Sequence, residues 1–83
     1  SHVAPYMVVL HCANQDAEKH AMDFLRGKVK KCVVKSKTVQ QDAVELTAEI
    51  RLADENTDFV NALSQIPGVT SAVLVSYNGD YMG

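Results

Sequence analysis

The chain is 83 residues long, which is the size of one small domain, and 47% of its residues are hydrophobic against 22% that are charged. This balance is typical of a folded globular domain and excludes an intrinsically disordered chain. The net charge of −2 is too small to imply a polyanionic partner, although residues 1–37 carry +4 and residues 38–83 carry −6. No apolar run reaches the length of about 20 residues that a membrane-spanning helix needs.

The beginning of the chain predicts a strand followed by a helix. The segment "YMVVLH" at 6–11 is β-branched and apolar on both alternating sets, which is typical of a central strand. Either Asn14 or Asp16 can cap the helix that follows. Apolar residues then recur at helical spacing, so we expect a helix at about 16–26 that ends at Gly27.

Two strands joined by a short turn are predicted next. The segment "KVKKCVVKSKTV" alternates loosely, with Cys32 on one side and Lys35 and Lys37 on the other. After "QQD", the segment "AVELTAEIRL" at 43–52 alternates strictly between apolar and polar residues, which indicates a strand with one buried and one polar face. The short connection makes the two strands an antiparallel hairpin.

A second helix is expected at about 57–65, where apolar residues again keep helical spacing, and Pro67 and Gly68 end it. The stretch 69–77 alternates as a fourth strand. The resulting βαββαβ order predicts an α+β fold of the ferredoxin-like type, with both helices on one face of the sheet. Right-handed crossovers place strands one and three in the middle, so the expected strand order is 4-1-3-2.

No constellation in the sequence points to catalysis, to a cofactor or to an intrinsic metal site. Cys12 and Cys32 are predicted to be free thiols, and together with His11 and His20 they match no zinc-binding spacing. The serines lack a nucleophile-elbow context, and no phosphate-binding glycine pattern is present. We therefore expect a protein that is not an enzyme.

Five lysines near the middle of the chain are the strongest electrostatic feature. They allow two interpretations: a surface that faces an anion such as a membrane headgroup, or charges that protect an edge strand from aggregation, which is the simpler of the two. The face beside them offers carboxylates instead of stacking aromatics, so nucleic acid is not an expected partner. The lysines are Lys28, Lys30, Lys31, Lys35 and Lys37.

The first and last strands have apolar residues on both alternating sets, yet helices can cover only one face of the sheet. Apolar surface left exposed usually marks an interface, so we expect the domain to pair with its own copy or to dock on another domain. The chain after the last strand is expected to dock as well. The predicted interface residues are Met7, Val9, Ala72, Leu74, Tyr77 and Tyr81.

Two long segments, "VKSKTVQQDAVELTAEIRL" and "TDFVNALSQIPGVTSAVLVSYNGDY", resemble a bacterial family. Its members are integral membrane proteins of unknown function that carry a soluble C-terminal domain ending in a "SYNGDY"-like motif. The resemblance implies that residues 1–83 are a single domain cut from a longer membrane protein and located on the cytoplasmic side of the bacterial inner membrane. The remainder of that parent protein is then an expected partner.

The architecture is also similar to that of ACT-type regulatory domains, which pair side by side and bind small effectors. The segment "HCANQD" lacks the glycine-rich ligand loop that those sensors have after their first strand. The predicted function is therefore a regulatory or assembly domain that acts through sheet-mediated self-association or docking. The alternative is a small-molecule or metal sensor with its ligand at a dimer interface near the first strand.

Overall fold

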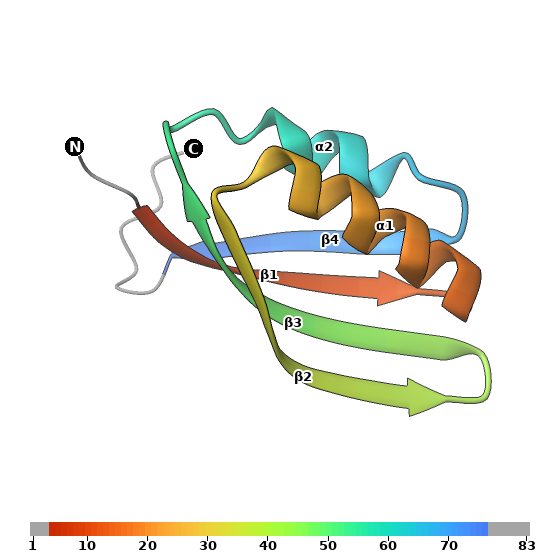
Figure 1. Cartoon of the computed structure of the whole chain (residues 1–83). Coiled ribbons are helices and arrows are strands. Elements are labelled where there is room, and N and C mark those ends of the chain that lie inside the picture. Colours follow the sequence, from red (N-terminus) through yellow and green to blue (C-terminus); the bar gives the residue numbers. More distant parts are fainter. Residues whose placement is uncertain (1–3, 77–83) are drawn as a thin grey trace.

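A computed structural model describes residues 4–76 and shows two helices packed on one face of a four-stranded sheet (Figure 1). The sheet is antiparallel in the order β2-β3-β1-β4, which confirms the predicted fold and strand order. Within these residues neither helix has the length and apolarity to cross a membrane. The elements are β1 (Ala4–Cys12), α1 (Gln15–Lys28), β2 (Lys31–Gln40), β3 (Ala43–Leu52), α2 (Asp58–Ser64) and β4 (Val69–Ser76).

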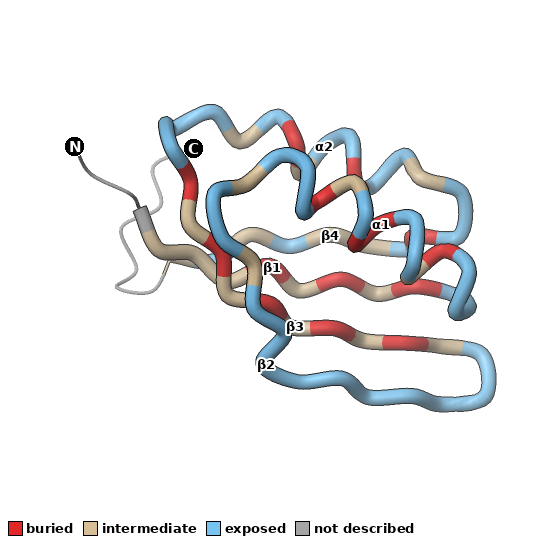
Figure 2. The backbone as a smooth tube through the Cα atoms, in the orientation of Figure 1, coloured by how far each residue is buried: buried red, intermediate tan, exposed pale blue. Residues whose placement is uncertain are grey.

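The core lies between the helices and the strands β1, β3 and β4 (Figure 2). Alternation along β3 buries every second residue, as the sequence pattern predicts. No polar or charged side chain is buried among the described residues, so burial of apolar surface holds the two layers together. The largest fully buried side chains are Val8, Leu10, Cys12, Leu25, Ile50 and Leu63.

Helix α1 starts at a side-chain cap. Of the two predicted capping residues, Asn14 is the one used, because its Oδ1 accepts a hydrogen bond of 2.9 Å from the Ala17 N–H. The helix then runs to Lys28, so the predicted end at Gly27 is wrong. Val29 has extended backbone angles and closes the helix instead.

The turn before β4 is fastened to the start of α1. Gly68 has a φ of 88°, a left-handed conformation that glycine adopts at little cost. Its carbonyl accepts a 2.7 Å hydrogen bond from the Ala13 N–H, and a Cβ at this position would lie 2.7 Å from the Ala17 Cβ. A glycine is therefore required both by the backbone angle and by the close approach of α1.

Strand β2 lies outside the helix layer and is exposed along almost its whole length (Figure 2). Its pairing with β3 shifts between Val34 and Ser36, so that Lys35 forms a bulge. Beyond the bulge Lys37 is paired with the inward-facing Leu46. The prediction that Lys35 and Lys37 share a side is therefore wrong, because the extra residue turns Lys37 toward α1.

Candidate functional site

The sheet face opposite the helices carries four apolar side chains on two neighbouring strands. Met7 is paired with Val75, and Val9 is paired with Val73. Val73 is 42% exposed and Val75 is 46% exposed, so the patch is open to solvent within residues 4–76. We call Met7, Val9, Val73 and Val75 the β1/β4 patch; it is the candidate interaction site.

The structure assigns the predicted interface residues to different places. Met7 and Val9 lie in the patch. Ala72 and Leu74 are paired with the buried Leu10 and Val8 and pack against the core on the helix side. Tyr77 and Tyr81 lie outside the described residues.

Val73 and Val75 replace Ala72 and Leu74 in the patch because β4 also contains an irregularity. The partner of β1 moves from Ser71 at His11 to Val69 at Cys12, which leaves Thr70 as an extra residue. The Thr70 hydroxyl donates a 3.1 Å hydrogen bond to the carbonyl of His11. The extra residue changes which side chains of β4 face the helices, and the local sequence does not predict it.

One end of the patch is formed by a histidine held between two polar side chains. The His11 Nε2 lies 2.7 Å from Glu45 Oε2, and its Nδ1 lies 2.8 Å from Ser71 Oγ. In the tautomer with the proton on Nε2, the ring donates to the carboxylate and accepts from the serine hydroxyl. The three residues come from β1, β3 and β4, and sequence reasoning missed them because only strand pairing brings them together.

This His11–Glu45–Ser71 cluster has the order of groups found in activated serine nucleophiles. The side chains of His11 and Glu45 are 42% and 45% exposed, however, and both helices lie on the other face of the sheet (Figure 1). Such exposure removes the low-dielectric surroundings that make preorganised charge stabilisation effective. The arrangement therefore favours a cross-strand polar rim over a catalytic centre.

The other end of the same face is basic. Arg51 Nη1 lies 2.8 Å from Glu49 Oε2, and Lys35 Nζ lies 4.0 Å from the other oxygen of that carboxylate. Along β3, Arg51 is opposite Pro5 and Glu45 is opposite His11, so the basic and the acidic ends are separated by the length of the patch.

The five predicted anion-facing lysines do not act as one group. Lys37 reaches across to α1 and lies 2.7 Å from Glu18 Oε2, whereas Lys35 faces the open side of the sheet. Lys28 lies over the Phe24 ring at 5.4 Å from its centroid. Lys30 lies in the connection from α1 to β2 and Lys31 is the first residue of β2, so the basic surface is concentrated at this corner of the molecule.

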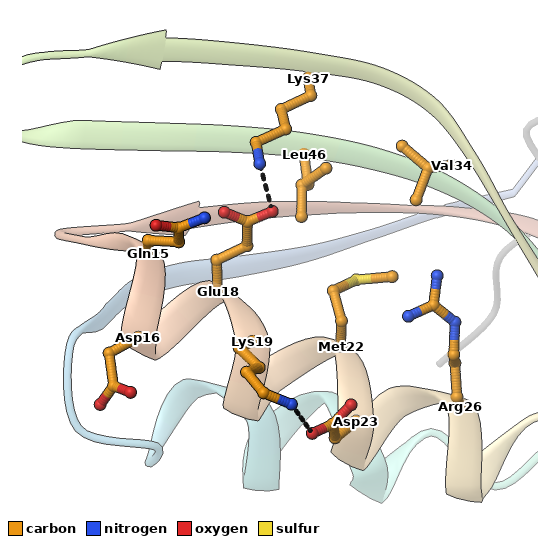
Figure 3. A pocket seen from close by; sticks show the side chains of 10 residues that line it. All are labelled: Gln15, Asp16, Glu18, Lys19, Met22, Asp23, Arg26, Val34, Lys37 and Leu46. Atoms are coloured by element: carbon orange, nitrogen blue, oxygen red, sulfur yellow. Dashed lines mark hydrogen bonds and ion pairs between the residues drawn. The ribbon is translucent and has the colours of Figure 1, made fainter.

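A groove of about 640 Å³ runs between α1 and β2, at an edge of the sheet that the two described helices leave uncovered (Figure 3). Its apolar part is formed by Met22, Val34 and Leu46. Lys37 and Glu18 join the two walls through their ion pair. The sequence did not predict this groove.

The cysteines are free thiols, as predicted. Burial is the main cause that raises the pKa of Cys12, and the nearby Glu18 carboxylate adds to it. Burial also raises the pKa of Cys32, against the opposing effect of the Arg26 guanidinium. Both thiols are therefore poor nucleophiles at neutral pH. No group of three or more metal-ligating side chains occurs in the described part of the chain.

No protein-family model and no curated protein sequence matches the chain. Among solved structures, the C-terminal domain of the MgtC protein from Mycobacterium tuberculosis has the same fold, with a TM-score of 0.70. The match covers 89% of this chain and 87% of that chain at 19% sequence identity. That neighbour is a domain of a bacterial membrane protein, which agrees with the sequence resemblance; at this identity the likeness shows the fold.

Proposed function

We propose that this chain is a non-enzymatic assembly domain on the cytoplasmic side of a bacterial membrane protein, where it brings copies of the parent protein together. The observation that supports this proposal is the exposed β1/β4 patch on a sheet face that neither helix of the described chain covers. Contiguous apolar surface of this kind is usually buried against a partner.

A second copy of the chain fits this face through charge as well as apolarity. A two-fold axis that lies in the plane between two stacked sheets and runs across their strands places patch on patch. It also reverses the strand direction, so the Arg51 and Lys35 end of one copy meets the Glu45 end of the other. Such an interface is self-complementary, as two-fold symmetric dimers require.

The expected affinity is modest because the patch is small. Burying apolar surface contributes roughly 25 cal/mol per Å², and association must first offset the loss of rigid-body freedom. Attachment of two copies to one membrane raises their effective concentration, which allows a weak interface to act. In such a membrane-attached dimer we expect the basic corner at Lys28, Lys30 and Lys31 to lie near the anionic headgroups of the membrane.

Sedimentation velocity of the chain at concentrations up to about 1 mM tests the proposal. The wild-type chain is expected to form a reversible dimer, and a Val73→Glu, Val75→Glu double variant is expected to stay monomeric. Val39→Glu is the matched control, because Val39 is 65% exposed on β2 and faces the helix side. A wild-type chain that is monomeric throughout, or a control that loses the dimer as fully as the double variant, contradicts the proposal.

A second candidate function is a small-molecule or metal sensor whose ligand binds at the dimer interface near β1. The His11–Glu45–Ser71 cluster favours it, because it lies at the rim of the patch beside a hollow of about 130 Å³. A thermal-shift panel of amino acids, nucleotides, phosphates and divalent metals separates the two functions. A micromolar ligand that raises the melting midpoint of the wild type and not of His11→Gln supports the sensor; no shift across the panel contradicts it.

A further inference from the structure

We propose that the groove between α1 and β2 binds an elongated small molecule that has an acidic group at one end, an apolar middle and a hydrogen-bond donor at the other end. The groove lies on the helix side of the sheet, so this inference is independent of self-association through the open face.

The groove exists because β2 projects beyond the helix layer. The two described helices lie over β1 and β4 (Figure 1). Strand β3 still buries every second side chain, whereas β2 is exposed along almost its whole length. Val34 is 40% exposed there, beside the buried side chains of Met22 and Leu46. These three residues provide an apolar floor in a space of about 640 Å³, a volume typical of small-molecule sites.

The donor end of the proposed ligand is defined by Glu18. Its Oε2 is paired with Lys37, but its Oε1 is buried and has no hydrogen-bond partner within the described residues. The Glu18 side chain is only 14% exposed, so water satisfies this oxygen poorly. A buried acceptor without a partner is unfavourable. A ligand N–H reaches Oε1 when the Glu18 side chain shifts toward the groove, and the hydrogen bond formed then offsets that cost.

The acidic end is defined by Arg26, whose guanidinium rises from α1 toward the strands (Figure 3). Within residues 4–76 the structure gives Arg26 no hydrogen bond and no ion pair. The neighbouring cation on the same helix, Lys19, is already paired with Asp23 at 3.2 Å. Arg26 is therefore the cation in the groove that is available to a carboxylate or phosphate, which a guanidinium binds with two parallel hydrogen bonds.

The spacing of these two groups sets the length of the ligand. Glu18 and Arg26 are eight positions apart on α1, which corresponds to roughly 12 Å along the helix axis. The apolar floor lies between them, because Met22 is midway along this stretch of the helix. A linear ω-amino acid of about eight carbons, with its two charged groups roughly 10 Å apart, has the required chemistry.

The probe is 8-aminooctanoate, and its controls are octanoate and octylamine, each of which lacks one charged group. Binding is followed by NMR shifts of the Met22 methyl group. We expect 8-aminooctanoate to bind about tenfold more tightly than either control. The Arg26→Gln variant is expected to bind 8-aminooctanoate no more tightly than the wild type binds octylamine. The Glu18→Gln variant is expected to bind 8-aminooctanoate no more tightly than the wild type binds octanoate.

Lys28→Gln is the matched control, since this helix cation stacks on Phe24 and does not line the groove. Its affinity for 8-aminooctanoate is expected to be unchanged, and urea unfolding verifies that all three variants fold. The proposal is overturned if 8-aminooctanoate fails to shift Met22 at about 10 mM. It is equally overturned if all three compounds bind alike, or if Arg26→Gln and Glu18→Gln lose no more affinity than Lys28→Gln.

Discussion

The two outer strands of the sheet differ in where their exposed valines lie: β4 leaves them on the open face, and β2 leaves them on both faces. On β4 the inward side chains of Ala72 and Leu74 pack under the helix layer, and Val73 and Val75 face solvent on the open side. On β2 the helix layer is missing, so Val34 and Val39 are exposed on the helix side, and Val33, which is paired with Glu49, is exposed on the open side. Exposed valines therefore belong to the proposed interaction face on β4, and Val34 belongs to the proposed ligand groove beside β2, because the helix layer covers one edge of the sheet and not the other.

The attachment of β4 to the helix layer is broken most severely by Gly68→Ala. The substitution forces a residue with a side chain into a positive φ and drives its Cβ to 2.7 Å from that of Ala17. We expect the free energy of unfolding to fall by about 3 kcal/mol, measured by urea denaturation.

Gly27→Ala is the control for this change, because a Cβ at Gly27 meets nothing within 4 Å. It is expected to stabilise the chain by about 1 kcal/mol or less, since alanine is the better helix former. Equal destabilisation by the two substitutions contradicts the tight packing of the turn on α1.

Truncation of one apolar side chain on each outer strand compares their packing directly. Leu74→Ala removes contacts with the core and is expected to cost about 2 kcal/mol of unfolding free energy. Val34→Ala removes a side chain that is already 40% exposed and is expected to cost less than about 1 kcal/mol. If Val34→Ala costs as much as Leu74→Ala, then β2 is covered in solution and the groove is not open.

Replacement of Lys35, the bulged residue of β2, and of Lys37, which follows the bulge, tests the strand register. Lys37→Ala removes the 2.7 Å partner of Glu18, whose side chain is only 14% exposed, and is expected to cost about 1 kcal/mol. Lys35→Ala loses only a 4.0 Å contact and is expected to have almost no effect. Urea unfolding at low and high salt measures both, and a larger loss for Lys35→Ala means that the strand is registered without the bulge.

The smallest expected effect is the dependence of stability on alkaline pH. The pKa values of Cys12 and Cys32 are raised in the folded state above the usual 9.0, so the unfolded chain releases thiol protons first. The contribution of these two thiols to the free energy of unfolding is therefore fully present below the usual value of 9.0 and falls as the pH rises past it. Urea unfolding from pH 7 to 10 measures the decline, and a Cys12→Ala, Cys32→Ala variant is expected to decline less. An identical decline in that variant means that other groups cause it.

The sequence predicted the architecture because local patterns determine it. Strict alternation in β3 marks the buried face, the Asn14 cap marks the start of α1, and the short turn defines the hairpin. Each of these signals depends on residues that are neighbours in the chain. The helix-covered face, the core and the strand order follow from them.

The candidate site was predicted less well because pairing between distant residues determines it. The bulges at Thr70 and Lys35 are set by the partner strand, and each reverses the faces beyond it. Because of these bulges, Val73 and Val75 lie in the patch instead of the predicted Ala72 and Leu74, and Lys35 and Lys37 lie on opposite faces of the sheet. The His11–Glu45–Ser71 cluster and the Glu18–Lys37 pair likewise join elements far apart in sequence, so no local pattern reveals them.

The central claim is that the β1/β4 patch of one copy packs on the same patch of another. An isotope-filtered NOE experiment on a mixture of methyl-labelled and unlabelled chains at about 1 mM measures this packing directly. It is predicted to show contacts between Val73 of one copy and Val75 of the other, and between Met7 of one copy and Val9 of the other. A spectrum with no intermolecular contact at these four residues, or with contacts confined to β2, contradicts the claim.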